Sequence, residues 1–309
     1  MKHIVLVTYG EPITPAFVDQ LVYSWRILLG LTRTVADIPA PLIPLIALSR
    51  ARDRNALWRR SDYNSPLEPI TLAQAAQLRN ALAHQTEDRW KVHVAYEFRD
   101  PLLSTVIEQL PRNEMVVVAP MYAADSSFTH DLSRTTVANL GSRQAPVLVL
   151  PAIDVDVLAR VSADHVMQSL GADAANTRSA ALVLAAHGTL MKPAKPIETG
   201  LLATEQLRCR IEQQLSGSFA IIANGWLNHT RGGKWTEPPI EETLKRVSEA
   251  GFREVVYYPY GFLADNAESQ LEGRLAAAGR PELKVQFIAC LNASPDLAET
   301  IASQVLAAR

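Results

Sequence analysis

His187 closes an apolar run, residues 181–186 (ALVLAA), and is followed directly by Gly188. Such a run predicts a buried strand that ends in a turn at the histidine. In open α/β sheets, ligands bind in the crevice beyond the carboxyl ends of the strands, and an imidazole accepts a proton near neutral pH. The pattern therefore predicts a general base at His187, although a histidine satisfied by the backbone within the core would show the same pattern.

Three carboxylates follow the apolar lead-in at residues 261–263. Glu268 and Glu272 are four residues apart, so they share one face of the helix expected there. Asp265 lies one turn earlier, near the helix start. The lead-in places this helix start at a strand end, in the same crevice as His187. Alternatively, Asp265 caps the helix and the two glutamates lie on a solvated face.

Aromatic side chains also follow strand candidates. Trp226 and Trp235 lie in a glycine-rich polar loop after residues 219–223. Tryptophans in such a loop either stack on a flat aromatic ligand or close the core beneath the loop. Tyr9 and Tyr122 occupy comparable turns in the N-terminal half. These rings lie at the same ends of their strands, although the turn at Tyr122 would also suit the N-capped start of a helix.

The composition excludes several classes of protein. The 309 residues favour two domains, and the 48% of hydrophobic residues can form sizeable cores. A formal charge of -2 gives no electrostatic case for nucleic-acid binding. Cys209 and Cys290 fit neither a metal site nor a disulfide framework, which indicates a reducing, cytoplasmic setting. Residues 1–10 resemble a first strand rather than a signal peptide, no run is long enough to span a membrane, and no dinucleotide, P-loop or zinc-protease motif is present.

Short apolar runs alternate with longer helical patterns, which predicts α/β architecture with parallel sheets and helical crossovers. Residues 4–10 and 181–188 resemble each other, and each opens a set of about four strands. The sequence therefore predicts two similar domains, residues 1–151 and 152–309. The strand candidates are residues 4–7, 92–96, 115–119, 147–150, 181–185, 219–223, 255–258 and 285–288, and the helix candidates are residues 71–83, 101–109, 155–169, 238–249 and 294–308.

Residues 37–60 break this rhythm, because three prolines stand among aliphatic residues and several arginines, beginning with Arg50, follow them. The prolines argue against a single long helix. An apolar segment flanked by arginines predicts either a lip over a pocket for an apolar, anionic ligand or a contact with a membrane surface. The alternative is a segment packed into the core, with its arginines solvated.

Six blocks of the chain, taken in order, resemble the ferrochelatase family, whose members insert ferrous iron into a porphyrin. Each block alone is weakly specific, whereas six in register over nearly the whole chain are specific. The resemblance implies two Rossmann-like domains, each a parallel sheet flanked by helices, with a porphyrin cleft between them. The blocks are residues 7–12 (VTYGEP), 64–71 (NSPLEPIT), 119–122 (APMY), 186–188 (AHG), 234–238 (KWTEP) and 261–265 (GFLAD).

The resemblance also implies catalytic roles. His187 matches the histidine that accepts pyrrole protons, and Glu268 matches the facing carboxylate that handles metal or protons. Glu272 and Asp265 lie on an acidic ridge that leads from Glu268. The predicted metal contacts are His187, Glu268, Glu272, which would bind transiently, and Asp265, which would bind weakly. A base and anionic oxygens suit this reaction, because a porphyrin loses two N–H protons while a divalent cation enters.

The same resemblance implies substrate contacts. Tyr9 matches the tyrosine that approaches the iron in coproporphyrin-type members, and Ser65 matches a position near a propionate. Arg50 belongs to the apolar lip, residues 37–60, and a guanidinium is suited to a propionate. Tyr122 and Trp235 complete the predicted contacts with the macrocycle. In protoporphyrin-type members, the lip also touches the membrane.

Two residues depart from the family pattern. Asn266 stands where a second histidine is usual, and Ala276 stands at the third position of the acidic ridge. A relay along this ridge would therefore depend on His187 and Glu268. The sequence has no cysteine cluster for the iron–sulfur centre of some members, and we expect no permanently bound cofactor.

The expected partners are thus a porphyrin and ferrous iron, with at most reversible membrane contact through the lip. This predicts a cytoplasmic protein or one at the membrane periphery. The substrate is coproporphyrin III if Tyr9 decides and protoporphyrin IX if the long lip decides. One alternative is a chelatase for another tetrapyrrole or metal, such as a sirohydrochlorin cobaltochelatase. The other is a tetrapyrrole-binding protein without catalytic activity.

Overall fold

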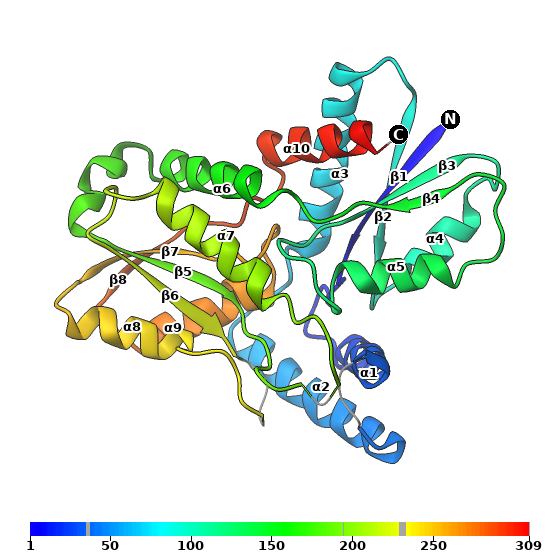
Figure 1. The fold of residues 1–309 in the computed structure, drawn as a ribbon. Coiled ribbons are helices and arrows are strands. Elements are labelled where there is room, and N and C mark those ends of the chain that lie inside the picture. The colour runs from blue at the N-terminus through cyan, green and yellow to red at the C-terminus, as the bar shows by residue number, and fades with distance from the viewer. Residues whose placement is uncertain (35–37, 194, 229–232, 309) are drawn as a thin grey trace.

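The computed structural model describes residues 1–34, 38–193, 195–228 and 233–308, and within them the strands form two sheets (Figure 1). Each sheet has four parallel strands, in the order β2-β1-β3-β4 in the first and β6-β5-β7-β8 in the second. The predicted α/β class with two parallel sheets is confirmed. The strands are β1 (Lys2–Thr8), β2 (Trp90–Tyr96), β3 (Met115–Pro120), β4 (Val147–Val149), β5 (Ala181–His187), β6 (Ile221–Leu227), β7 (Glu254–Tyr258) and β8 (Lys284–Phe287).

The two sheets share one topology. In each, the first strand along the chain lies between the second and the third, so β1 lies between β2 and β3, and β5 lies between β6 and β7. The chain therefore leaves the first strand to one side and later crosses to the other. The crevice beyond the strand ends at such a switch point is the ligand site of open α/β sheets. The molecule has two such points, β1/β3 and β5/β7.

Helices cover both faces of each sheet. Alternate residues of β1 face different cores: Ile4 and Leu6 lie in the core that includes α3, and Val5 and Val7 lie in the core that includes α4. Burial on both faces explains why the strands are continuous apolar runs. The helices are α1 (Phe17–Thr34), α2 (Ile43–Arg60), α3 (Leu67–Gln85), α4 (Leu103–Gln109), α5 (His130–Ala138), α6 (Val155–Leu170), α7 (Leu201–Gln214), α8 (Ile240–Glu249), α9 (Gly273–Ala278) and α10 (Pro295–Ala307), with short 3-10 helices at Ala40–Leu42 and Gly171–Ser179 and a π-helix, η3, at Ala267–Glu272.

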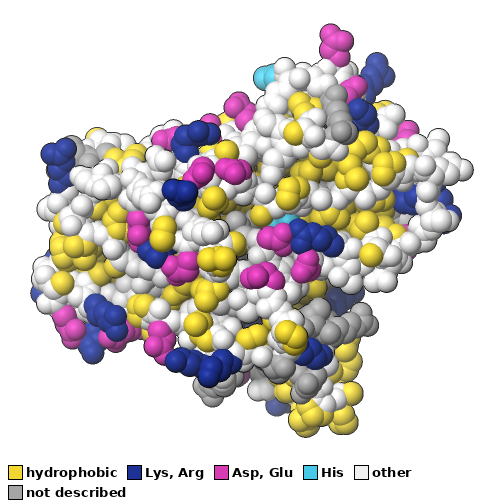
Figure 2. All heavy atoms as spheres, viewed as in Figure 1, with side chains coloured by type: hydrophobic (Ala, Val, Ile, Leu, Met, Phe, Trp, Pro, Cys, Tyr) yellow, Lys and Arg dark blue, Asp and Glu magenta, His cyan; other side chains and the backbone are white. Residues whose placement is uncertain are grey.

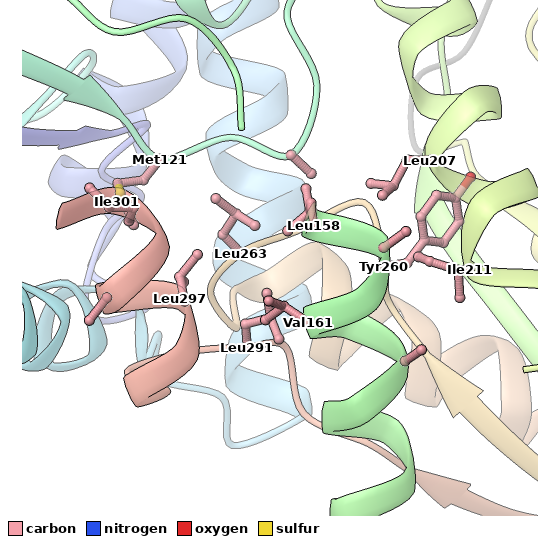
Figure 3. Packing of buried hydrophobic residues seen from close by; sticks show 14 of the residues in the cluster. Met121, Leu158, Val161, Leu207, Ile211, Tyr260, Leu263, Leu291, Leu297 and Ile301 are labelled. Atoms are coloured by element: carbon pink, nitrogen blue, oxygen red, sulfur yellow. The ribbon is translucent and has the colours of Figure 1, made fainter. Parts of the chain in front are cut away.

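The largest hydrophobic core joins the two halves of the chain. Leu297 and Ile301 of α10 lie in the same core as Met121, which follows β3 of the first sheet, and Leu158 of α6 (Figure 3). Helix α10 packs against α3, and α6 packs against α7. The predicted domain boundary at residues 151–152 falls in the connection between β4 and α6. It remains a prediction, because the core is continuous across it.

The lip is largely helical. Pro44 lies in the first turn of α2, where a missing N–H costs no hydrogen bond, so the helix runs through all the arginines to Arg60. The sequence was right that no single helix covers residues 38–60, but it did not predict α2. Residue 37, the predicted start of the lip, lies outside the described residues. Leu42 and Leu45 are exposed at the start of α2, and Figure 2 shows hydrophobic side chains at this end of the molecule. Among the helices that the structure describes, none has the length and apolar character needed to cross a membrane.

Candidate active site

His187 and Glu268 form a hydrogen-bonded pair at the switch point of the second sheet. His187 is the last residue of β5, and Glu268 lies in the π-helix η3, which follows β7. The distance between His187 Nδ1 and Glu268 Oε1 is 2.6 Å. The imidazole is 51% exposed and the carboxylate 18%. The structure therefore brings the predicted base and its facing carboxylate into direct contact, with the ring open to solvent.

Gly261 allows the two strand ends to approach this closely. A β carbon at position 261 would lie 2.7 Å from Ala186 Cβ and 2.8 Å from Ala186 Cα, which no side chain tolerates. The N–H of Gly261 also donates to the carbonyl oxygen of Ala185 at 3.3 Å. The loop after β7 thus lies directly against the end of β5, next to His187.

Asn266 starts the helix that carries Glu268. Its side-chain oxygen accepts hydrogen bonds from the N–H groups of Glu268 and Ser269 at 2.9 and 3.0 Å. In return, Ser269 Oγ accepts from the Asn266 N–H at 3.0 Å, which completes a reciprocal cap. The residue that replaces the second histidine of the family pattern therefore stabilises the helix start. Ala276, at the missing third acid, is buried in the core beside Tyr257.

Asp265, the residue before Asn266, ties the same loop to the segment around residues 290–292. Its carboxylate accepts hydrogen bonds from Gln270 Nε2 at 2.7 Å, Cys290 N at 2.9 Å and Asn292 Nδ2 at 2.8 Å. Three donors on a buried carboxylate leave little capacity for a cation. Asp265 therefore fixes the loop before η3. Asn266 caps the helix in place of Asp265, so that alternative was wrong, and the weak metal contact of Asp265 stays a prediction.

Glu272 lies one turn beyond Glu268 on η3, and both carboxylates act electrostatically on Tyr257. Burial raises the pKa of the Tyr257 hydroxyl, and these two negative charges contribute to the shift. Within the described ranges, no group of three or more His, Cys, Asp or Glu side chains is arranged to hold a metal ion. Of the three predicted metal ligands on this side, His187 and Glu268 are in direct contact, and Glu272 lies on the same helix as Glu268.

Glu11 is a site residue that the sequence did not single out. It follows β1 and is only 7% exposed. Its Oε1 accepts hydrogen bonds from the N–H of Ala267, at 3.0 Å, and from Ser65 Oγ, while its Oε2 lies 3.9 Å from Arg54 Nη2. Burial raises the pKa of the Glu11 carboxyl, although the Ser65 hydrogen bond and the Arg54 charge oppose this. The available signal was an acid directly after a strand, inside the block at residues 7–12.

The predicted tyrosines form an aromatic cluster at the switch point of the first sheet. The ring of Tyr9 stacks on Phe98, with centroids 5.8 Å apart, and meets Tyr122 edge-on at 4.8 Å. Tyr9 donates its hydroxyl hydrogen to the carbonyl oxygen of Phe128 at 2.9 Å, and burial raises its pKa. Tyr122 is buried, with a hydroxyl that has no hydrogen-bond partner among the described residues. Tyr122 therefore packs against Tyr9 as a buried neighbour.

The other predicted substrate contacts are dispersed. Ser65 is buried, and its hydroxyl already serves Glu11 and the N–H of Leu67. Arg50 is half-buried on α2, where burial and the neighbouring Arg54 lower the pKa of its guanidinium. Trp235 is half-buried and pairs its backbone with Leu190.

Trp226, the first of the two tryptophans, lies in β6 instead of the glycine-rich loop; it is only 2% exposed and packs in the core. A stacking role for Trp226 was therefore wrong, because its ring closes the core beneath the loop. Trp235 keeps partial exposure and stays the candidate for stacking on a ligand.

Solved structures identify the class of this fold. CbiX, the terminal enzyme for biosynthesis of siroheme in denitrifying bacteria, is similar with a TM-score of 0.58 and 16% identity, and the match covers 100% of both chains. SirB from Bacillus subtilis, solved with Fe3+, is similar with a TM-score of 0.55 and 14% identity over 99% of this chain and 95% of that one. This chain, with its two parallel sheets of the same strand order, therefore has a chelatase-like fold.

The sequence identifies the family within that class. The sequence model of the Ferrochelatase family matches residues 2–309, so the chain belongs to the ferrochelatase family. A ferrochelatase of Geotalea daltonii is 25% identical over 322 aligned positions, which cover 98% of this chain and 96% of that protein. Ferrochelatase-2, chloroplastic, of Cucumis sativus is 24% identical over 283 positions, which cover 86% of this chain. The match spans about half, 54%, of the cucumber protein.

Proposed function

We propose that this chain inserts ferrous iron into a porphyrin, either coproporphyrin III or protoporphyrin IX, in haem biosynthesis. The observation that carries the proposal is the 2.6 Å contact between His187 and Glu268 at a strand-end switch point, on a half-exposed imidazole. Membership of the ferrochelatase family supports the reaction class. The similarity in fold to CbiX, an enzyme of siroheme biosynthesis, supports a tetrapyrrole as substrate, and the similarity to SirB, solved with Fe3+, supports iron.

The tautomer of His187 gives it a defined task. Nδ1 lies 2.6 Å from Glu268 Oε1. With Glu268 ionised, the carboxylate only accepts hydrogen bonds, so in this proposal Nδ1 carries the proton and Nε2 is the ring nitrogen that acts as the base. As Fe2+ enters the macrocycle, two pyrrole N–H protons must leave. Nε2 takes one of them, and Glu268 stabilises the imidazolium that forms. The imidazolium then releases that proton to solvent and can accept the second.

Metal delivery falls to the carboxylates of η3. Iron(II) accepts both imidazole and carboxylate ligands, so Glu268 and Glu272 are suited to pass the ion towards the macrocycle without holding it permanently. In this proposal Fe2+ is a substrate, and the protein needs no iron–sulfur centre or other resident cofactor. In the same proposal, Arg50 contacts a propionate and Trp235 contacts the ring of the porphyrin. Tyr9 and Ser65 lie at the edge of the site, where they keep their hydrogen bonds to Phe128 and Glu11.

The lip supports a reversible contact with a membrane surface. Leu42 and Leu45 are 45% and 63% exposed at the start of α2, and arginines follow along the same helix. Exposed aliphatic side chains beside cations are suited to the boundary of an anionic bilayer. We place the protein in the cytoplasm, with transient contact at the membrane periphery.

Insertion assays with three tetrapyrroles test the proposal. Purified protein is mixed anaerobically with Fe2+ and coproporphyrin III, protoporphyrin IX or sirohydrochlorin, and the metallated product is followed by absorbance. Turnover with either porphyrin supports the proposal and identifies the substrate. Turnover with sirohydrochlorin alone would show the rival chelatase. Tight binding of a tetrapyrrole without insertion of any divalent metal would show a non-catalytic binding protein.

A further inference from the structure

The start of η3 depends on an acceptor from the other half of the chain. The first N–H groups of a helix have no partner within it. Three of the four such groups at the start of η3 are satisfied within the cap. The Asn266 side chain accepts from the N–H groups of Glu268 and Ser269 at 2.9 and 3.0 Å, and Ser269 Oγ accepts from the N–H of Asn266 at 3.0 Å. The remaining one, on Ala267, donates to Glu11 at 3.0 Å, across 256 positions in the sequence.

Glu11 is held by the N-terminal half while it makes this contact. Ser65, at the approach to α3, donates to its carboxylate, and Arg54 of α2 lies 3.9 Å away. The same face of η3 packs on α2, because Ala267 and Leu271 share a small hydrophobic cluster with Trp58. The Glu11 carboxylate is therefore held in place by residues of α2 and of the segment before α3, while its own backbone belongs to the loop after β1.

We propose that Glu11 is a positioning residue for metal insertion, which fixes the first turn of η3 and thereby orients Glu268 towards His187 Nδ1. Glu268 is the residue directly after Ala267, so the backbone that Glu11 holds sets where its carboxylate begins. A buried N–H that lost its acceptor would move to find another. Such a movement would lengthen the 2.6 Å contact between Glu268 and His187.

The role in catalysis rests on the proposed function, but the contact itself does not. Glu11→Gln keeps a carbonyl oxygen for Ala267 N–H and Ser65 Oγ, whereas Glu11→Ala removes both acceptors. Positioning therefore predicts that Gln preserves the geometry of the pair and Ala does not. If the negative charge of Glu11 were what mattered, both variants would lose the geometry of the His187–Glu268 pair. Glu282→Gln is the matched control, because Glu282 is an exposed glutamate in the connection between α9 and β8.

The test reads the pair directly, without any metal or tetrapyrrole. In protein labelled with 15N-histidine, the His187 Nδ1–H resonance is assigned by its loss in His187→Ala. We expect Glu11→Gln and Glu282→Gln to leave this resonance at its wild-type position, and Glu11→Ala to shift it or broaden it through exchange with water. A folded Glu11→Ala protein with an unchanged resonance would overturn the proposal, as would Glu11→Gln and Glu11→Ala moving it equally.

Hydrogen exchange of the Ala267 amide needs no variant. We expect it to be protected in the wild-type protein, and exchange at the rate of an open amide would overturn the proposal even if Glu11→Ala failed to fold. If insertion is observed, Glu11→Ala should lower kcat by about 10- to 100-fold with little change in KM for the tetrapyrrole, because a displaced catalytic group chiefly affects the reacting step. If insertion is absent while the resonance and exchange behave as expected, the proposed function fails, and what stands is that Glu11 orients Glu268 towards His187.

Discussion

Gly261→Ala is expected to destabilise the protein and to separate His187 from Glu268. The added β carbon would lie 2.7 Å from Ala186 Cβ and 2.8 Å from Ala186 Cα, whereas ordinary contacts begin at 3.4 Å. The loop after β7 must therefore retreat by roughly 0.7 Å, the difference between 3.4 and 2.7. Overpacking of this kind costs about 1–3 kcal/mol. A displacement approaching 1 Å at a reacting group lowers rates by about 100-fold.

Gly141→Ala is the matched control for this variant. Gly141 is exposed, and a β carbon there would meet no atom within 4 Å. We expect its free energy of unfolding, measured with urea, to stay within about 0.5 kcal/mol of the wild type. Gly261→Ala should lose about 1–3 kcal/mol in the same assay and most of its metal-insertion activity. If Gly261→Ala matched Gly141→Ala in both stability and kcat, the close approach of the two strand ends would not be what holds the site together.

Three further predictions concern the helix cap, a buried acid and the lip. Asn266→Ala should lower the free energy of unfolding by about 1 kcal/mol, because two N–H groups of η3 lose their acceptor, and Asn266→Asp should restore most of it; equal urea midpoints for all three proteins would contradict the cap. Burial raises the pKa of Glu97 to about 7, so the folded protein binds more protons than the unfolded chain between pH 4.5 and 7, and this carboxyl makes stability fall as pH rises through that window. Glu97→Gln should flatten that part of the profile of unfolding free energy against pH, and an unchanged slope would refute the assignment. Wild-type protein should float with anionic liposomes and be released by dilution, Leu45→Asp combined with Leu42→Asp should float less, and no flotation of the wild type would exclude the membrane contact.

The sequence predicted the parts of the site that follow from strand ends. His187 closes an apolar run, and Glu268 follows a second run through an apolar lead-in, so parallel pairing alone brings their elements to one edge of a sheet. Local patterns of this kind are visible in a window of ten residues, which is why the proximity of His187 and Glu268 could be predicted from the sequence.

The missed features depend on partners far away in the sequence. Glu11 meets Ala267 across 256 positions, and no local pattern distinguishes it from a solvated acid after a strand. The structural partners of Asp265 could not be predicted either, because residues around position 290 supply donors to its carboxylate and nothing in the nearby sequence shows this. The helix α2 was missed for a different reason, since Pro44 was weighed as a helix breaker although it lies in the first turn.

Iron insertion by His187→Ala, beside His84→Ala, tests the central claim most directly. His84 is an exposed histidine near the end of α3, so its loss controls for the removal of any imidazole. A general base contributes about 100- to 10,000-fold to the rate of proton transfer. With the porphyrin that the wild type metallates, His187→Ala should therefore lose at least about 100-fold in kcat while His84→Ala keeps the wild-type value. Full activity in a folded His187→Ala protein would contradict the assignment of this histidine as the proton acceptor.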